Sequence, residues 1–152
     1  MEMNNHAWTL AEKPDPTPAE EEEMLHAAHA SALHWSRVGG ESNRARADML
    51  LGQVHALLGH GALALRYARR SHEYILAHAS PGWEIAFSHA VLANAAHAAH
   101  EVSLYEAEYS LAKRLGADIT DAGEKEIFGR TFARLPAPKG ESGRNDIRAA
   151  SD

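Results

Sequence analysis

The positions of the helix breakers constrain the fold of this chain most. Its six prolines lie between segments of helix length, at their first positions or after the last of them. Gly39-Gly40 and Gly59-His60-Gly61 separate further segments of the same kind. No stretch shows sustained alternation of apolar and polar residues with β-branched side chains, which a sheet would require. The sequence therefore predicts an all-α chain.

The spacing of these breakers predicts about six helices joined by short loops. Short loops between helices favour antiparallel neighbours. The expected helices run from 18 to about 38, from 43 to near 58, from 62 to about 79, from 81 to near 100, from 103 to about 115 and from 121 to 135.

Capping signals mark several of these starts. Thr17 at the N-cap, Pro18 at the first helical position and Glu20 at the third position match a capping box. Ser42 or Asn43 can cap the second helix, and Ser80 before Pro81 can cap the fourth. Two further capping boxes are predicted, Ser103 with Glu106 and Asp121 with Glu124.

Three regions follow from this reading. Residues 1–16 form an N-terminal arm that carries Trp8 and Leu10, residues 17–135 form a single helical domain, and residues 136–152 form a tail. The tail has almost no large apolar side chains and is rich in Gly, Pro and charge, so we expect it to be disordered.

Composition limits the partners and the location. At 152 residues and 45% hydrophobic residues, one core is the default. The net charge of −6 opposes nucleic acid, and no apolar run reaches the roughly 20 residues of a membrane span. The absence of cysteine fits a reducing compartment, and the N-terminus lacks the pattern of a secretory signal, so we expect a cytoplasmic protein.

Residues 45–72 carry a helix-pair pattern that returns less clearly at 85–115, which gives a period of roughly 40 residues. Its clearest positions are Leu51-Gly52, Gly59 and the series Ala64, Ala68 and Ser71. In these positions the sequence resembles the tetratricopeptide-repeat family. The resemblance implies a right-handed stack of antiparallel helix pairs in which Gly52 lies against Ala64 and Gly59 permits the turn. Residues 85–115 match less well, since Asn94 occupies a usually apolar place and no glycine marks the turn.

The same resemblance implies a peptide-binding groove on the concave face. The residues it places there are Arg46, Met49 and Gln53 on one inner helix and His89, Ala96 and His100 on the next. Such a groove would be polar, partly basic and able to accept a protein segment.

A repeat array needs about three repeats to be stable alone. This sequence supplies about two and a half, with 17–38 as an unpaired opening helix and 122–135 as a final capping helix. Homodimerisation is the hypothesis that this shortfall suggests.

The motif His-Ala-Ala-His occurs twice, at 26–29 and at 97–100. Glu22, His26 and His29 would share one helical face, which makes them a candidate triad for a divalent transition metal. Only one Glu-x-x-His sequence, Glu23 to His26, is present, and no zinc-protease motif occurs. Packing or hydrogen bonding between helices is the alternative interpretation of these histidines.

The function we expect is that of an adaptor or assembly module that binds a protein or peptide, without a cofactor and without catalysis of its own. The alternative is a histidine-rich helical bundle that binds a transition metal for catalysis or sensing. A third hypothesis is regulation of a larger protein, with Trp8 and Leu10 docking into a neighbouring groove.

Overall fold

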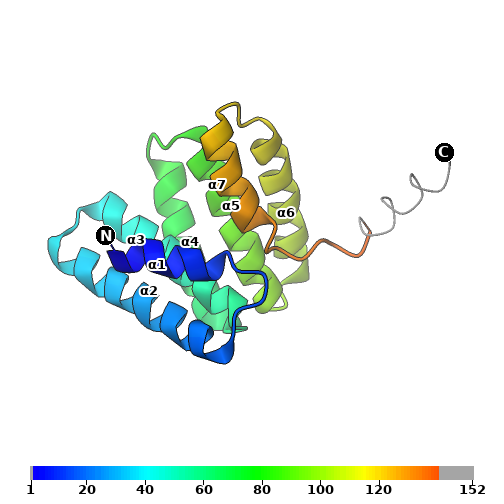
Figure 1. Ribbon diagram of the computed structural model, residues 1–152. Coiled ribbons are helices and arrows are strands. Elements are labelled where there is room, and N and C mark those ends of the chain that lie inside the picture. The colour runs from blue at the N-terminus through cyan, green and yellow to red at the C-terminus, as the bar shows by residue number, and fades with distance from the viewer. Residues whose placement is uncertain (1, 141–152) are drawn as a thin grey trace.

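The computed structural model describes residues 2–140, and these form seven α-helices and no strand (Figure 1). The chain is therefore all-α, as predicted. The helices are α1 (Glu2–Ala11), α2 (Pro18–Val38), α3 (Glu41–Leu57), α4 (Gly61–Ala77), α5 (Gly82–Ala98), α6 (Val102–Ala117) and α7 (Ala122–Phe132).

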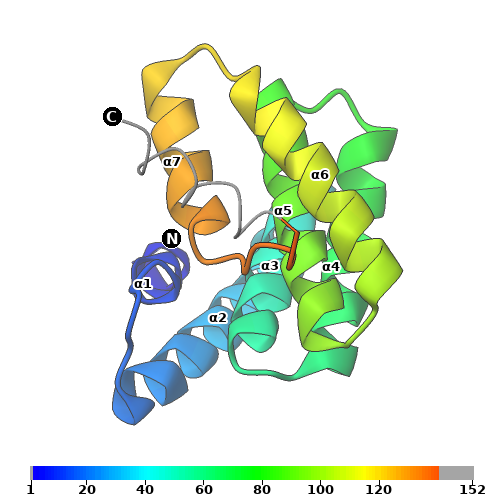
Figure 2. The same ribbon diagram turned by 90° about the vertical axis from the view of Figure 1, so that its right-hand side faces the viewer.

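Alternate helices form two layers. The odd-numbered helices contact one another in series, α1 with α3, α3 with α5 and α5 with α7. Of the even-numbered helices, α2 packs on α1 and α3, α4 on α3 and α5, and α6 on α5 and α7. Figure 2 shows α1 and α7 on the same side of the stack. The antiparallel pairs α1/α2, α3/α4 and α5/α6 followed by α7 are consistent with a helical stack.

The predicted N-terminal arm is a helix and part of the domain. Ala7, Leu10 and Ala11 of α1 are buried, with Leu10 only 7% exposed. They share a core cluster with Met24 of α2 and Leu50 of α3. The helix at 18–38, predicted to be unpaired, therefore has α1 as its partner.

The predicted caps are confirmed at two helices. The Glu20 N–H donates to Thr17 Oγ1 over 3.3 Å while the Thr17 N–H donates to Glu20 Oε2 over 2.9 Å, which completes the capping box of α2. At α7 the Glu124 N–H donates to Asp121 Oδ1 over 2.9 Å. Each bond satisfies a backbone donor that the helix itself leaves unpaired.

The other three predicted caps are wrong. Helix α6 begins at Val102 after Glu101, without a side-chain cap from Ser103. Pro81 holds the N-cap position of α5, so Ser80 does not cap it. At α3 the N-cap is Gly40, and Asn43 Oδ1 accepts from the Gly40 N–H over 3.2 Å.

The turns after α3 and α5 repeat each other. Gly59 (φ 76°) lies two residues beyond α3, and His100 (φ 60°) lies two residues beyond α5. Both are left-handed positions, which glycine adopts freely and histidine adopts more often than most residues. His100 therefore occupies the turn position that Gly59 fills one repeat earlier, and the missing glycine is explained.

Close approach of helices explains two small residues. A Cβ at Gly52 would lie 3.0–3.1 Å from backbone and Cβ atoms of Ala68, one helical turn from the Ala64 contact that was predicted. A Cβ at Gly61 would lie 2.5 Å from Ala99 Cα, which no L side chain tolerates without movement. The start of α4 thus packs directly on the end of α5.

The two ends of the described chain meet. Arg134, just after α7, donates from Nη1 to Pro14 O over 2.9 Å and from Nε to Ala11 O over 3.3 Å. Arg130 of α7 lies 3.6 Å from Glu12. We call these contacts the terminal clasp.

Of the predicted tail, residues 136–140 are described, and Pro136 O accepts a hydrogen bond from the Tyr105 hydroxyl. Residues 141–152 lie outside the described part.

Candidate functional site

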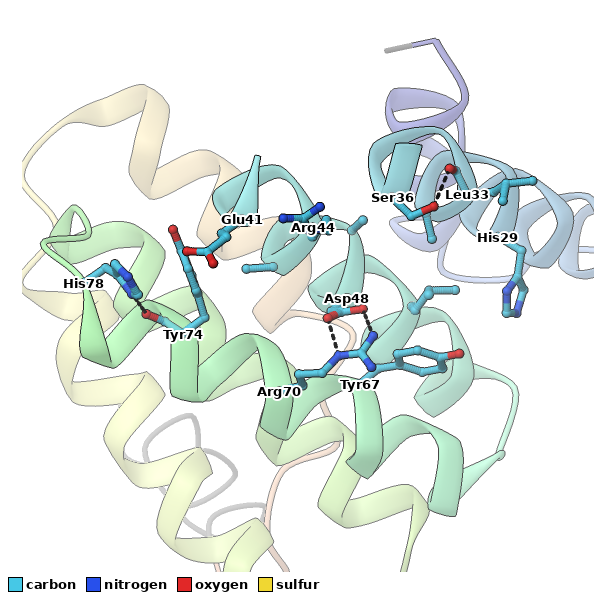
Figure 3. A pocket seen from close by; sticks show the side chains of 14 residues that line it. His29, Leu33, Ser36, Glu41, Arg44, Asp48, Tyr67, Arg70, Tyr74 and His78 are labelled. Carbon is cyan, nitrogen blue, oxygen red and sulfur yellow. Dashed lines mark hydrogen bonds and ion pairs between the residues drawn. The ribbon is translucent and has the colours of Figure 1, made fainter. Parts of the chain in front are cut away.

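A cleft of about 890 Å³ opens between α2 and α4, with α3 as its floor (Figure 3). We call it the α2–α4 cleft. The cleft is lined by three helices and by His78, the residue after α4. The helical lining residues are His29, Ala32, Leu33 and Ser36 of α2; Glu41, Arg44, Ala45, Ala47, Asp48 and Leu51 of α3; and Tyr67, Arg70 and Tyr74 of α4.

Small and aliphatic side chains make the floor. Ala45, Ala47 and Leu51 are buried at 5%, 3% and 2% exposure. Alanine has no side chain beyond Cβ, so the floor leaves room between the flanking helices. The α2 wall adds Leu33, whose side chain is largely exposed. The base of the cleft is therefore apolar.

A bidentate ion pair crosses from the floor to the α4 wall. Arg70 Nε donates to Asp48 Oδ2 over 2.6 Å, and Arg70 Nη2 donates to Asp48 Oδ1 over 2.5 Å. The hydrogen bonds to Asp48 raise the pKa of Arg70. The guanidinium carbon also lies 5.4 Å from the ring centroid of Tyr67, within cation–π range. This arrangement holds Arg70 and Tyr67 in fixed positions (Figure 3).

Tyr74 and His78 form the other end of the α4 wall. Their rings stack with centroids 3.9 Å apart, and His78 Nδ1–H donates to Tyr74 O over 2.7 Å. Across the cleft, the Ser36 hydroxyl donates to Leu33 O over 2.7 Å. The wall therefore presents flat aromatic surfaces opposite a short, polar side chain.

The rim carries charge of both signs. Glu41 and Arg44 are exposed at the start of α3. Among the residues that the structure describes, Arg44 makes no ion pair, whereas Arg70 is neutralised by Asp48. Arg44 is thus a cation available to a ligand at the mouth of the cleft.

A group of histidines adjoins the cleft at His29. The His29 and His55 ring centroids are 5.3 Å apart, and His55 stacks on Tyr67 at 5.7 Å. The Nδ1 atoms of His55 and His60 are 3.0 Å apart. Burial, with contributions from His29 and His60, lowers the pKa of His55 to about 4. His55 is therefore neutral at pH 7, and its ring stacks on the ring of Tyr67.

The residues predicted for a peptide groove do not form one surface. Met49, Gln53, His89 and Ala96 have exposures of 5%, 1%, 8% and 0%, so four of the six lie in the core. Gln53 Oε1 accepts a hydrogen bond from Asn94 Nδ2 over 3.1 Å, which explains how Asn94 occupies a usually apolar place. His100 is exposed in the turn after α5.

Two predicted groove residues do line a cavity on the face formed by the odd-numbered helices. Arg46 and Met49 border about 230 Å³. The other lining residues are Asn4, Trp8, Glu12, Trp83, Glu84, Phe87 and Ile127. Arg46 Nε donates to Glu84 Oε1 over 2.7 Å, and this hydrogen bond raises the pKa of Arg46. We call this space the inner-face cavity.

The predicted metal triad lies on the surface of α2. Glu22, His26 and His29 are exposed. His26 faces a shallow hollow with His6 and Glu23, which are hydrogen-bonded to each other over 2.7 Å. Within the described residues, a different set of three side chains could hold a metal ion. Its potential ligand atoms, which belong to His72, His89 and Glu108, lie within 4.8 Å of one another.

Sequence reasoning missed the residues of both new features. Asp48, Tyr67 and Arg70 come from two helices, and no sequence motif links them. His72, His89 and Glu108 come from three helices, so their distances depend on packing. In each case the signal lies in the tertiary fold and not in local spacing.

The fold and the cleft define a class of protein, an all-α helical stack with an open cleft between two outer helices. No helix in the described residues is long and apolar enough to cross a lipid bilayer. Comparison with protein-family models found no match, and comparisons with curated proteins and with solved structures found no significant match.

Proposed function

We propose that this protein is a peptide-binding adaptor, built like a tetratricopeptide-repeat stack, that holds a segment of a partner protein in the α2–α4 cleft. It has no catalysis of its own in this proposal, and it acts in the cytoplasm, as its lack of cysteine suggests. The observation that carries the proposal is an open cleft of about 890 Å³ with an apolar floor and an aromatic and charged wall.

The lining is of the kind that protein interfaces use. Tyrosine and arginine are enriched at interfaces because they combine a large contact area with directed polar groups. Tyr67 and Arg70 are held in place by Asp48 and His55, so binding costs little loss of side-chain freedom at these positions. Preorganisation of this kind favours a binding role.

The inner-face cavity is the weaker candidate. It has a volume of only about 230 Å³, and Trp8 and Phe87 line it with rings whose centroids are 5.2 Å apart. The terminal clasp also joins the two ends of the stack beside it. A peptide would have to displace these contacts to enter.

The chemistry of the cleft specifies an amphipathic segment. Its apolar side chains would pack on Ala45 and Leu51, and an acidic side chain would pair with Arg44 at the rim. A helix or a short extended strand of such composition would bury apolar surface and place its charges in solvent.

Selection from a displayed peptide library tests this function. The selected peptides should be amphipathic with an acidic position, and Ser36→Trp should weaken their binding by at least about tenfold because the indole fills the cleft. Ser110→Trp on α6 is the matched control, since Ser110 is also an exposed helical serine bonded to its own backbone over 2.9 Å. Fluorescence anisotropy with the wild type and both variants gives the affinities. Equal affinity of the two variants would show that the peptides bind elsewhere.

A further inference from the structure

Three side chains from three successive helices converge next to the core. His72 projects from α4, His89 from α5 and Glu108 from α6, and one ligand atom of each lies within 4.8 Å of the other two. Nδ1 of His89 is 2.5 Å from Glu108 Oε2, and the rings of His72 and His89 meet edge to face with centroids 4.5 Å apart. The group is separate from the α2–α4 cleft.

These side chains are held away from bulk water. The side chains of His89 and Glu108 are 10% and 13% exposed, and His72 is half-buried. Two imidazoles and a carboxylate gathered in such a place form a set of potential metal ligands that is largely shielded from solvent. The hydrogen bond between His89 and Glu108 engages one nitrogen and one oxygen of this set.

The tautomer of His72 leaves a nitrogen ready to bind. The Ser88 hydroxyl donates its single proton to Ile85 O over 2.8 Å, so it accepts from the Nδ1–H of His72 over 2.9 Å. Nε2 of His72 then carries a lone pair, and no hydrogen bond to it occurs within residues 2–140. A histidine whose other nitrogen donates to a protein acceptor is the usual form of a metal ligand. Burial, aided by His89, also lowers the pKa of His72, which favours the neutral ring that a metal requires.

We propose that His72, His89 and Glu108 form a binding site for a divalent transition-metal ion such as Zn²⁺. Two imidazole nitrogens and one carboxylate oxygen are a ligand set that Zn²⁺ accepts, with a fourth position left for water or a ligand from a partner. Ligand atoms of a tetrahedral zinc with bonds of about 2.1 Å lie roughly 3.4 Å apart. Side-chain rotations that widen the 2.5 Å gap between His89 Nδ1 and Glu108 Oε2 would reach that geometry. The proton of this hydrogen bond would then move to Nε2 of His89 or to solvent.

The ion would connect α4, α5 and α6, which belong to two adjacent helix pairs. Because the ligands are largely covered by protein, the site suits a structural or sensing ion better than one that turns over a substrate. The inference is independent of the peptide-binding proposal, since no residue of the site lines the α2–α4 cleft.

Zinc titration of tag-free, chelator-stripped protein is the first test. We expect about one Zn²⁺ per chain and a rise in melting temperature of roughly 5 °C at a free zinc concentration about a hundred times the Kd. His72→Gln and Glu108→Gln should each weaken binding at least about tenfold. Circular dichroism confirms that each variant is folded.

Matched controls separate this site from the other histidines of the chain. The double variant His26→Gln/His29→Gln and the variant Glu106→Gln, an exposed carboxylate on α6, should bind zinc like the wild type. The proposal is overturned if the wild type binds no zinc, or if the His26/His29 variant loses zinc while His72→Gln retains it.

Histidine-resolved NMR of the wild type gives a test that needs no variant. One equivalent of Zn²⁺ should shift the imidazole resonances of His72 and His89 first. Shifts confined to other histidines at that ratio would contradict the proposed site.

Discussion

Gly61 has no side chain, and this allows the start of α4 to approach the backbone at the end of α5 closely. A Cβ there would lie 2.5–2.7 Å from backbone atoms of Ala98 and Ala99, whereas a Cβ at Gly82 would meet nothing within 4 Å. Both glycines are the first residue of a helix. The two positions therefore differ in packing and hardly at all in local conformation.

We predict that Gly61→Ala destabilises the fold by about 1–3 kcal/mol, because α4 and α5 must move apart. Gly82→Ala should be neutral or slightly stabilising, since alanine lowers the entropy of the unfolded chain. Urea denaturation of both variants measures the difference. Equal stabilities would mean that the contact between the start of α4 and the end of α5 is not formed.

His55 gives a prediction about pH. Its pKa is lowered to about 4 in the folded state by burial, with His29 and His60 beside it and Tyr67 stacked on it, while an unfolded histidine titrates near 6.5. Between these values the unfolded chain binds a proton that the folded chain does not. Stability is therefore full above about pH 6.5 and falls as the pH is lowered towards 4.

The loss from this residue should be about 1–3 kcal/mol. Urea denaturation between pH 7 and pH 4 measures it, with His55→Gln as the comparison because glutamine does not titrate. The variant should lose less stability than the wild type over this range. Parallel curves for the two proteins would contradict the assignment.

Among the elements, α1 is the one that the sequence placed wrongly. The stretch Lys13-Pro-Asp-Pro-Thr-Pro18 separates residues 1–16 from the first long helix, which predicts an arm. A segment of this length does not form a stable helix in isolation. Burial of Ala7, Leu10 and Ala11 against α2 and α3 supplies the stability that the segment lacks alone. Such a contact is tertiary and leaves no local signal.

The remaining elements were predictable because their signals are local. Proline and glycine positions predicted all six later helices. The capping box at Thr17 is present, and at Asp121 the N-cap bond from the Glu124 N–H is present. The site was not predictable in the same way. The resemblance places Arg46, Met49, Gln53 and Ala96 in one concave groove. In the structure Arg46 and Met49 line the inner-face cavity, whereas Gln53 and Ala96 lie in the packed interior. The rotation of a helix about its axis is set by neighbouring side chains and leaves no local signal.

Leu10→Ala tests whether α1 belongs to the domain. Removal of a buried leucine should cost about 2–4 kcal/mol. Leu76→Ala on α4 is the control, since Leu76 is 53% exposed and should cost little. Thermal or urea denaturation compares the two. If Leu10→Ala is as mild as Leu76→Ala, α1 is not docked in solution.

At the scale of the whole molecule, the terminal clasp connects residues more than a hundred positions apart. Arg134→Ala removes hydrogen bonds to the carbonyl groups of Ala11 and Pro14 and should cost about 1–2 kcal/mol. Arg37→Ala, an exposed arginine of α2, is the control. Hydrogen exchange should accelerate in both α1 and α7 of the first variant and in neither helix of the second. Acceleration in α7 alone would show that the clasp does not hold α1.

The number of helix pairs also bears on the oligomeric state. The homodimer was suggested by a count of two and a half repeats, but α1 and α2 form a further pair, which gives three pairs and α7 in the described residues. Three pairs meet the number that a repeat array needs to be stable alone, so we expect a monomer at micromolar concentration. Sedimentation velocity measures this directly, and a stable dimer would point to a surface beyond those described above.

An open helical stack can be lengthened, because each end offers a surface on which one more pair can be added. The clasp changes this for the present chain, since Arg130 and Arg134 bring the last helix against the first. A duplicated pair inserted between α4 and α5 would push α1 and α7 apart and break these contacts. Contact between the two ends therefore favours the present number of pairs, as closure does in a ring, over the longer arrays that an open stack allows.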